Sequence, residues 1–277
     1  MHEERHHGQI NNIDPKLGLH RIKDSIQLKY MGRQCEQLLK CLDEAIAVTE
    51  CFAPSGKKTY KLDGKTRPGL NKPIEIREKH WEEALWRFEE NLRKENAAWN
   101  ENSAWAWKKI ISLQELLKTK QTRDGWGEID LLAISEVGLP VVIELKIKKN
   151  EYLLRALLEA AAYGIALKKV WPLINKQWED AAKRLGIEVT PSLHLLSCPL
   201  AIIAPSDYWE NCIGSAAQKR KSGQILPDAW RPFHQLVSAL AQRGLPATFL
   251  EIESAGIDDN GLPAVTCLKR VPLPPER

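Results

Sequence analysis

Two β-rich runs joined by a short turn, within residues 127–146, constrain the fold of this chain most, because each run carries charged residues in an otherwise apolar strand. Side chains alternate between the two faces of a strand, so Glu128 and Asp130 share one face of the first run. The same alternation places Glu144 and Lys146 on one face of the second run. The connecting SEVGLP is short and contains Gly and Pro, which predicts an antiparallel hairpin with Asp130 close to Glu144.

The predicted hairpin brings two carboxylates and one ammonium group together at the end of an apolar sheet. Like charges placed together repel each other and lose hydration, and a bound cation compensates for both effects. Carboxylate oxygens and water are suitable ligands for Mg²⁺ or Mn²⁺, which in proteins commonly bind beside substrate phosphates. Lys146 would then act next to a metal-bound phosphate. The same residues also fit a partly buried ion-pair network, and both interpretations stay open at this point.

The spacing of these residues, an Asp followed after thirteen residues by Glu-x-Lys, resembles the core signature of the PD-(D/E)xK nuclease superfamily. The likeness is greatest to the branch that includes Holliday-junction resolvases, Mrr-like restriction enzymes and RecB-like nucleases. Asp130, Glu144 and Lys146 match the three signature residues, and Ile129 stands in place of the Pro. The resemblance implies an α/β fold of the restriction-endonuclease-like class, in which helices flank a mixed β-sheet core. We expect a helical N-terminal appendage to precede this core.

The resemblance further implies a metal-dependent nuclease, such as an endodeoxyribonuclease, that hydrolyses DNA phosphodiester bonds. Asp130, Glu144 and the main-chain carbonyl of Leu145 would hold one or two Mg²⁺ or Mn²⁺ ions, which polarise the scissile phosphate. Lys146 would orient or deprotonate the attacking water and offset developing negative charge. One alternative is a catalytically inactive nuclease-like module that binds DNA without cutting it. Another is a structural protein in which the charged cluster is an ion pair.

Other residues are candidates for completing this site. Many relatives add a Glu from the helix before the first site strand, and the apolar spacing within Pro73–Asn96 predicts such a helix, followed by a second over 103–117. A further helix, from about 151 to 167, resembles the family element that carries Gln-x-x-x-Tyr, with Glu in place of Gln. The accessory candidates are Glu89, Glu95, Glu115, Glu128, Glu159 and Tyr163.

Contacts to DNA are predicted next to the same site. Lys148 and Lys149 follow the second site strand, where they could bind the backbone phosphates that flank the cut. Trp126, in the DGWG turn, could contact DNA or cap the hairpin. The spacing of most other tryptophans predicts core residues, because aromatic side chains dominate packing area. The net charge of +4 neither requires nor excludes a nucleic-acid partner.

With 277 residues and 43% hydrophobic content, the chain can bury one substantial core and carry an appendage. We expect an accessory, partly helical region over residues 1–72, which ends in a basic linker, and a nuclease-like domain over 73–277. Beyond the site strands, the pattern predicts strands near 116–122 and 195–204, a helix over 232–243, and a hairpin of 248–252 with 264–270 around DDNG.

The cysteines and the hydropathy of the chain exclude some functions. Six cysteines occur without a Cys-x-x-Cys pair, so neither a zinc site nor a redox dithiol is predicted. No run approaches the roughly 20 apolar residues that span a bilayer, which predicts a soluble, cytoplasmic protein without a membrane partner. DNA is the expected partner. A homodimer is also an expectation, because cutting two strands commonly uses two sites.

Overall fold

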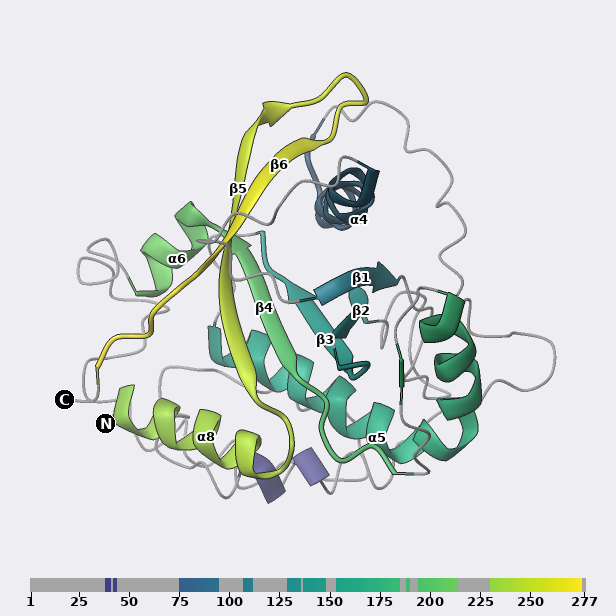
Figure 1. Cartoon of the computed structure of the whole chain (residues 1–277). Helices are drawn as coiled ribbons and strands as arrows, with labels where there is room; N and C mark the ends of the chain where they lie inside the picture. Colours follow the sequence, from purple (N-terminus) through teal and green to yellow (C-terminus); the bar gives the residue numbers. More distant parts are fainter. Residues whose placement is uncertain are drawn as a thin grey trace, which may run out of the picture.

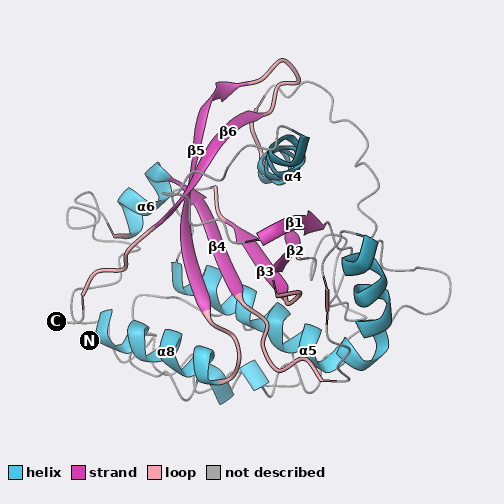
Figure 2. Ribbon diagram, viewed as in Figure 1, coloured by secondary structure: helices cyan, strands magenta, loops and turns pink. Residues whose placement is uncertain are grey.

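A mixed six-stranded sheet organises the chain, and helices cover both of its faces (Figure 1). The structure, a computed structural model, describes residues 38–40, 42–43, 75–94, 107–111, 129–135, 137–147, 153–184, 188–189, 194–213 and 230–275. Its elements in chain order are α4 (Glu78–Lys94), β1 (Trp107–Ile111), β2 (Leu131–Ser135), β3 (Pro140–Leu145), α5 (Leu153–Arg184), β4 (Leu200–Pro205), α6 (Ser206–Cys212), α8 (Trp230–Gln242), β5 (Ala247–Ile257) and β6 (Pro263–Arg270). The predicted α/β class is confirmed (Figure 2).

The strands lie in the sheet in chain order, from β1 to β6. The first three strands pair antiparallel, β4 pairs parallel with β3 and with β5, and β6 returns antiparallel to β5. The α5 helix makes the crossover that a parallel pair requires between β3 and β4. The predicted antiparallel hairpin of the two site strands is therefore confirmed, as is the C-terminal hairpin, whose strands extend beyond the predicted ranges.

The sheet separates two apolar cores, and β3 contributes to both. Val142 faces the core that contains α5, whereas Val141 and Ile143 face the core that contains Leu85 of α4. All three residues are fully buried, as expected for a central strand covered by helices on both sides. The site strands therefore have a helix over each face, and polar side chains at the end of β3 can reach either helix.

The N-terminus of α4 is fixed by its own side chains. The Nδ1 atom of His80 accepts a hydrogen bond of 2.7 Å from the Arg77 N–H, so one of the donors left open at the start of the helix is satisfied. Glu78 lies in the first turn, where a carboxylate interacts favourably with the helix dipole. The helix predicted within 73–96 is confirmed as α4.

One predicted helix differs from the structure. The helix predicted over 103–117 is wrong, because residues 107–111 form β1, which pairs antiparallel with β2. The β-branched Ile110 and Ile111 suit a strand, and pairing with a neighbour outweighs helical spacing over so short a run. The strand predicted at 116–122 lies outside the described residues.

The α5 helix is longer than predicted, since it continues past 167 to Arg184 and includes Pro172. Pro172 is exposed, while Trp171, Ile174 and Trp178 are buried on the same helix. Packing of these large side chains outweighs the helix-breaking tendency of one proline. The indole N–H of Trp178 also donates a 2.9 Å hydrogen bond to the Gly138 carbonyl, which ties the turn between β2 and β3 to this helix.

Part of the predicted N-terminal region packs into the main core. Residues 38–40 and 42–43 are helical, and Leu38, Leu39 and Leu42 are buried in the core that contains α5. The division into residues 1–72 and 73–277 stays a prediction. None of the helices in the described part of the chain combines the length and the apolar character needed to cross a membrane.

Candidate functional site

The β2–β3 hairpin brings the predicted Asp next to the predicted Glu-x-Lys strand. Asp130 lies in a bend immediately before β2, and its Oδ2 accepts a 2.8 Å hydrogen bond from the Leu145 N–H. The regular alternation of side chains thus begins at Leu131, and the prediction that Asp130 continues the strand is wrong. The bend turns this carboxylate toward the backbone of β3. A regular strand position would instead have directed it to one face of the sheet.

Lys146 is the centre of a buried ion-pair network on the α5 side of the sheet. Its Nζ lies 2.7 Å from Glu144 Oε1 and 2.9 Å from Glu159 Oε2. The other oxygen of Glu159 accepts a 3.2 Å hydrogen bond from Arg155 Nε. The side chains of Glu144, Lys146 and Glu159 are at most 8% exposed. Cations and carboxylates therefore alternate from the surface of α5 to β3. This arrangement fits the interpretation of the charged residues as an ion-pair network.

One carboxylate oxygen in this network lacks a hydrogen-bond partner among the described residues. Glu144 Oε2 is buried and has no hydrogen-bond partner among the residues that the structure describes. Burial raises the pKa of Glu144 well above its usual range, the nearby Asp130 and Glu159 carboxylates raise it further, and Lys146 lowers it. An orphaned buried carboxylate oxygen is unfavourable, so this atom has a strong tendency to bind a proton or a cation.

A second acidic group lies on the α4 side of Asp130. One carboxylate oxygen each from Glu78, Glu82 and Asp130 can be chosen so that all three lie within 4.8 Å of one another. Burial raises the pKa of Asp130 to about 8, with Glu78 as the next largest cause and Glu82 adding to it, while Lys146 and the Leu145 N–H lower it. Three carboxylates at this separation repel one another, and a divalent cation would remove the repulsion.

Sequence reasoning predicted a glutamate from this helix but chose other positions. Glu78 and Glu82 are four residues apart, so they lie on one face of α4. They also precede Trp81 and Leu85 of the apolar stripe by three residues each, which places them at the edge of the buried face. The spacing of these two glutamates to each other and to the apolar stripe was the signal in the sequence that pointed to them.

Glu159 and Tyr163 come together with the predicted site residues. Tyr163 lies one turn after Glu159 on α5 and is buried. Burial raises the pKa of Tyr163 well above its usual range, and the nearby carboxylates, Glu144 foremost, raise it further. Tyr163 therefore stays a neutral phenol beside the network.

The predicted roles of the remaining residues stay untested in the described part of the chain. Glu89 belongs to α4, and the carbonyl of Leu145 belongs to β3, where its role as a ligand stays a prediction. Six predicted residues lie outside the described residues: Glu95, Glu115, Trp126, Glu128, Lys148 and Lys149.

We expect the metal-free protein to become less stable as the pH rises toward 8. Asp130 has a pKa of about 8 in the folded chain, against an ordinary value of 3.8, so between these values the folded state binds more protons than the unfolded state. The free energy of unfolding should then fall by up to about 1.4 kcal/mol per pH unit. Urea unfolding in EDTA at several pH values measures this slope.

Asp130→Asn is the control for this slope, because the amide cannot titrate. The variant should show a flatter dependence of the free energy of unfolding on pH than the wild type does. Equal slopes for the two proteins would contradict the assignment of a raised pKa to Asp130. The comparison reports the titration of Asp130 together with its effect on Glu144, whose pKa the Asp130 charge raises.

Comparison with known proteins identified no relative of this chain. Neither protein-family models, nor curated proteins, nor solved structures gave a match to the chain. The chemistry of the site therefore has to be inferred from its own residues: three carboxylates at the junction of α4 and the β2–β3 hairpin, an orphaned carboxylate oxygen on β3, and a buried lysine beside it.

Proposed function

We propose that the chain is a metal-dependent nuclease with a restriction-endonuclease-like fold, and that it hydrolyses phosphodiester bonds of DNA. The mixed sheet with a helix over each face supports this proposal, as does the placement of Asp130 beside the Glu-x-Lys strand. A homodimer, in which two sites cut two strands, and a cytoplasmic location belong to the same proposal.

The observation that carries the proposal is the group of three carboxylates that includes Asp130, with the unpartnered oxygen of Glu144 close enough for the charge of Asp130 to act on it. Glu78 and Glu82 supply carboxylates within 4.8 Å from the α4 side, and the buried, unpartnered Oε2 of Glu144 supplies another from β3. An all-oxygen set of carboxylates is chemically suited to Mg²⁺ or Mn²⁺ and unsuited to softer metals. The donor set therefore fits the ion that the resemblance implies, with Asp130, Glu144 and a glutamate of α4 as its ligands.

The chain's own residues have distinct parts in the proposed reaction. A bound Mg²⁺ or Mn²⁺ would supply a Lewis acid for the phosphate and lower the pKa of the attacking water. The Leu145 N–H fixes the orientation of Asp130. Glu159 would hold the ammonium group of Lys146 when Glu144 binds the ion. Lys146 then stabilises the negative charge that develops on the phosphate.

A catalytically inactive DNA-binding module is the second candidate, and a specific observation favours it. Lys146 already contacts two carboxylates at 2.7 and 2.9 Å, so its charge is balanced within the protein alone. Buried ion pairs of this kind also occur as purely structural features. Under this alternative the chain binds DNA but leaves it intact.

Cleavage of circular duplex, linear duplex and single-stranded DNA by the full chain tests the proposal. We expect cleavage with Mg²⁺ or Mn²⁺ and none with EDTA. Binding of DNA without cleavage under any of these conditions would favour the inactive module. A chain that neither binds nor cuts DNA would leave the charged cluster as a structural ion pair, and the proposal would be wrong.

A further inference from the structure

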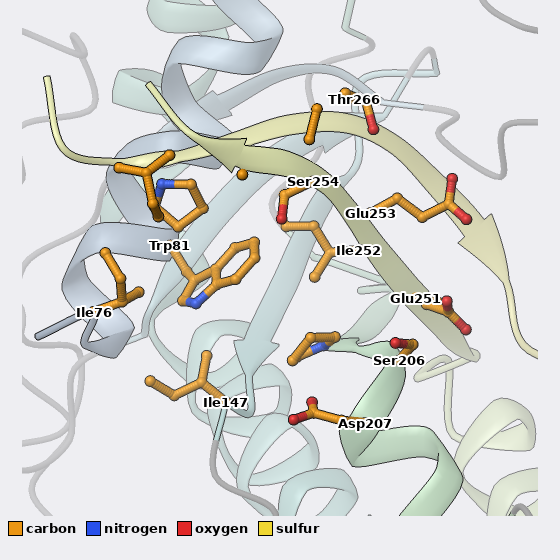
Figure 3. Close-up of a pocket in the computed structure, with 15 residues that line it drawn as sticks. Ile76, Trp81, Ile147, Ser206, Asp207, Glu251, Ile252, Glu253, Ser254 and Thr266 are labelled. Carbon is orange, nitrogen blue, oxygen red and sulfur yellow. The ribbon is translucent and has the colours of Figure 1, made fainter. Parts of the chain in front are cut away.

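A groove of about 830 Å³ lies between α4 and the β5–β6 hairpin (Figure 3). It adjoins the proposed site at two places. Ile76 and Trp81, which line the groove, stand on either side of Glu78 in the chain, and Ile147 follows Lys146 directly. A ligand in the groove would therefore lie next to the acidic cluster. The volume is within the range of about 300–1,000 Å³ that is typical of ligand pockets.

The centre of the groove is aromatic and apolar. The indole ring of Trp81, which is half-buried, lies in the middle of the view, with the side chains of Ile76, Ile147 and Ile252 around it (Figure 3). Of the fifteen described residues that line the groove, none is Lys, Arg or His. Phosphate groups are bound by cations and N–H donors, so this lining is unsuited to a DNA backbone.

The polar side chains among the described lining residues are three carboxylates, of Asp207, Glu251 and Glu253, and three hydroxyls, of Ser206, Ser254 and Thr266, so hydrogen-bond acceptors outnumber donors. The Ser206 hydroxyl and the Asp207 carboxylate lie at one end, and the Ser254 hydroxyl lies nearer to Trp81 (Figure 3). Glu253 is also part of the lining, but it forms an ion pair with Lys269. A flat aromatic ligand that donates hydrogen bonds through exocyclic amino groups matches this combination of an apolar floor and acceptor groups.

We propose that this groove binds an unpaired nucleobase next to the cleaved phosphodiester, and that the substrate is therefore DNA with single-stranded character at the cut. This inference rests on the proposed nuclease function. A base within a duplex has both faces stacked on its neighbours, so it can stack on Trp81 only after it has left the helix. Single-stranded, frayed or branched DNA offers such a base without the loss of a base pair.

Cleavage of matched single-stranded and blunt duplex oligonucleotides by Trp81→Ala and Trp81→Phe tests the inference. We expect Trp81→Ala to lower kcat/KM for the single strand by about tenfold, because one base–aromatic stack is lost. Trp81→Phe should retain most of the activity, since its ring can still stack. Removal of the base next to the cut should slow the wild type by a similar factor and should not slow Trp81→Ala further. An equal effect of Trp81→Ala on both substrates would overturn the inference.

A binding measurement separates failure of this inference from failure of the proposed function. A single-stranded oligonucleotide that contains 2-aminopurine changes its fluorescence when that base stacks, and cleavage is not required. We expect quenching on binding to the wild type and little quenching with Trp81→Ala, even if neither protein cuts DNA. Absence of quenching with the wild type would overturn the inference. Binding of a lysine-rich peptide in a Trp81-dependent manner, without a response to the oligonucleotide, would assign the groove to a protein partner.

Discussion

Replacement of Asp130 with Asn is expected to lower metal-dependent DNA cleavage by at least about a hundredfold, because the variant removes a negative ligand from the proposed ion. The amide oxygen of Asn can still accept the hydrogen bond from the Leu145 N–H, so the bend before β2 should remain. The loss would therefore reflect charge at the site, with the hairpin geometry unchanged.

The same substitution should leave the metal-free protein at least as stable as the wild type at pH 8. Burial, with Glu78 and then Glu82 adding to it, raises the pKa of Asp130 to about 8, so the ionised form of Asp130 is unfavourable in the folded chain. Removal of a charge that is repelled by its neighbours does not destabilise a fold. A variant that is inactive but at least as stable as the wild type would identify Asp130 as a functional residue, since replacement of a purely structural residue lowers the stability of the protein.

Asp259→Asn is the matched control for this experiment. Asp259 is exposed in the turn between β5 and β6, so its replacement makes the same chemical change far from the acidic cluster in the sequence. This control should keep both cleavage and stability close to the wild type. Cleavage by Asp130→Asn at the rate of the control would show that Asp130 is not part of an active site.

The site hairpin could be predicted from the sequence because its information is local. The β-rich runs, the short turn with Gly138 and the spacing of Asp130 to Glu144 are all contained within a single stretch of chain. The C-terminal hairpin around DDNG was predictable for the same reason, and its Asp258 accepts hydrogen bonds from the N–H groups of Asn260 and Leu262. Turn chemistry of this kind depends on few residues.

Other features could not be predicted because they depend on contacts between distant segments. The residues of β1 form a strand through pairing with β2, which follows them along the chain by about twenty residues. The pairing of Glu78 with Glu82 is visible in the sequence, but their approach to Asp130 depends on where α4 lies against the sheet, which no local pattern encodes. The exposure of Trp81 in the groove likewise depends on the β5–β6 hairpin, which is distant in sequence.

The second large effect is expected at Lys146. Lys146→Met should lower the free energy of unfolding at pH 8 by about 3–5 kcal/mol, because it leaves the buried carboxylates of Glu144 and Glu159 without their shared cation. The loss should be smaller at pH 5. Burial raises the pKa of Glu144 well above the usual range, and without the lysine this carboxylate binds a proton more readily, which removes one of the two negative charges that Lys146 balanced.

Lys269→Met provides the matched control for a lysine removed from an ion pair. Lys269 pairs with Glu253 on the β5–β6 hairpin, and its side chain is 51% exposed. An exposed pair of this kind contributes little to stability, so this variant should be nearly as stable as the wild type. A similar small loss for Lys146→Met would show that the buried network does not hold the hairpin and α5 together.

The double variant Lys146→Met, Glu159→Gln separates a structural role for Lys146 from a catalytic one. In Lys146→Met the carboxylate of Glu159 keeps only the partly exposed Arg155 as a cation. Replacement of Glu159 by a neutral amide removes one of the two buried carboxylates that Lys146 balanced, so much of the stability lost in Lys146→Met should return. If Lys146 acts on the phosphate, the stable double variant still cannot stabilise the developing charge and should cut DNA no faster than Lys146→Met. Recovery of cleavage together with stability would mean that Lys146 only keeps the site folded, and that Glu78, Glu82, Asp130 and Glu144 suffice for the chemistry.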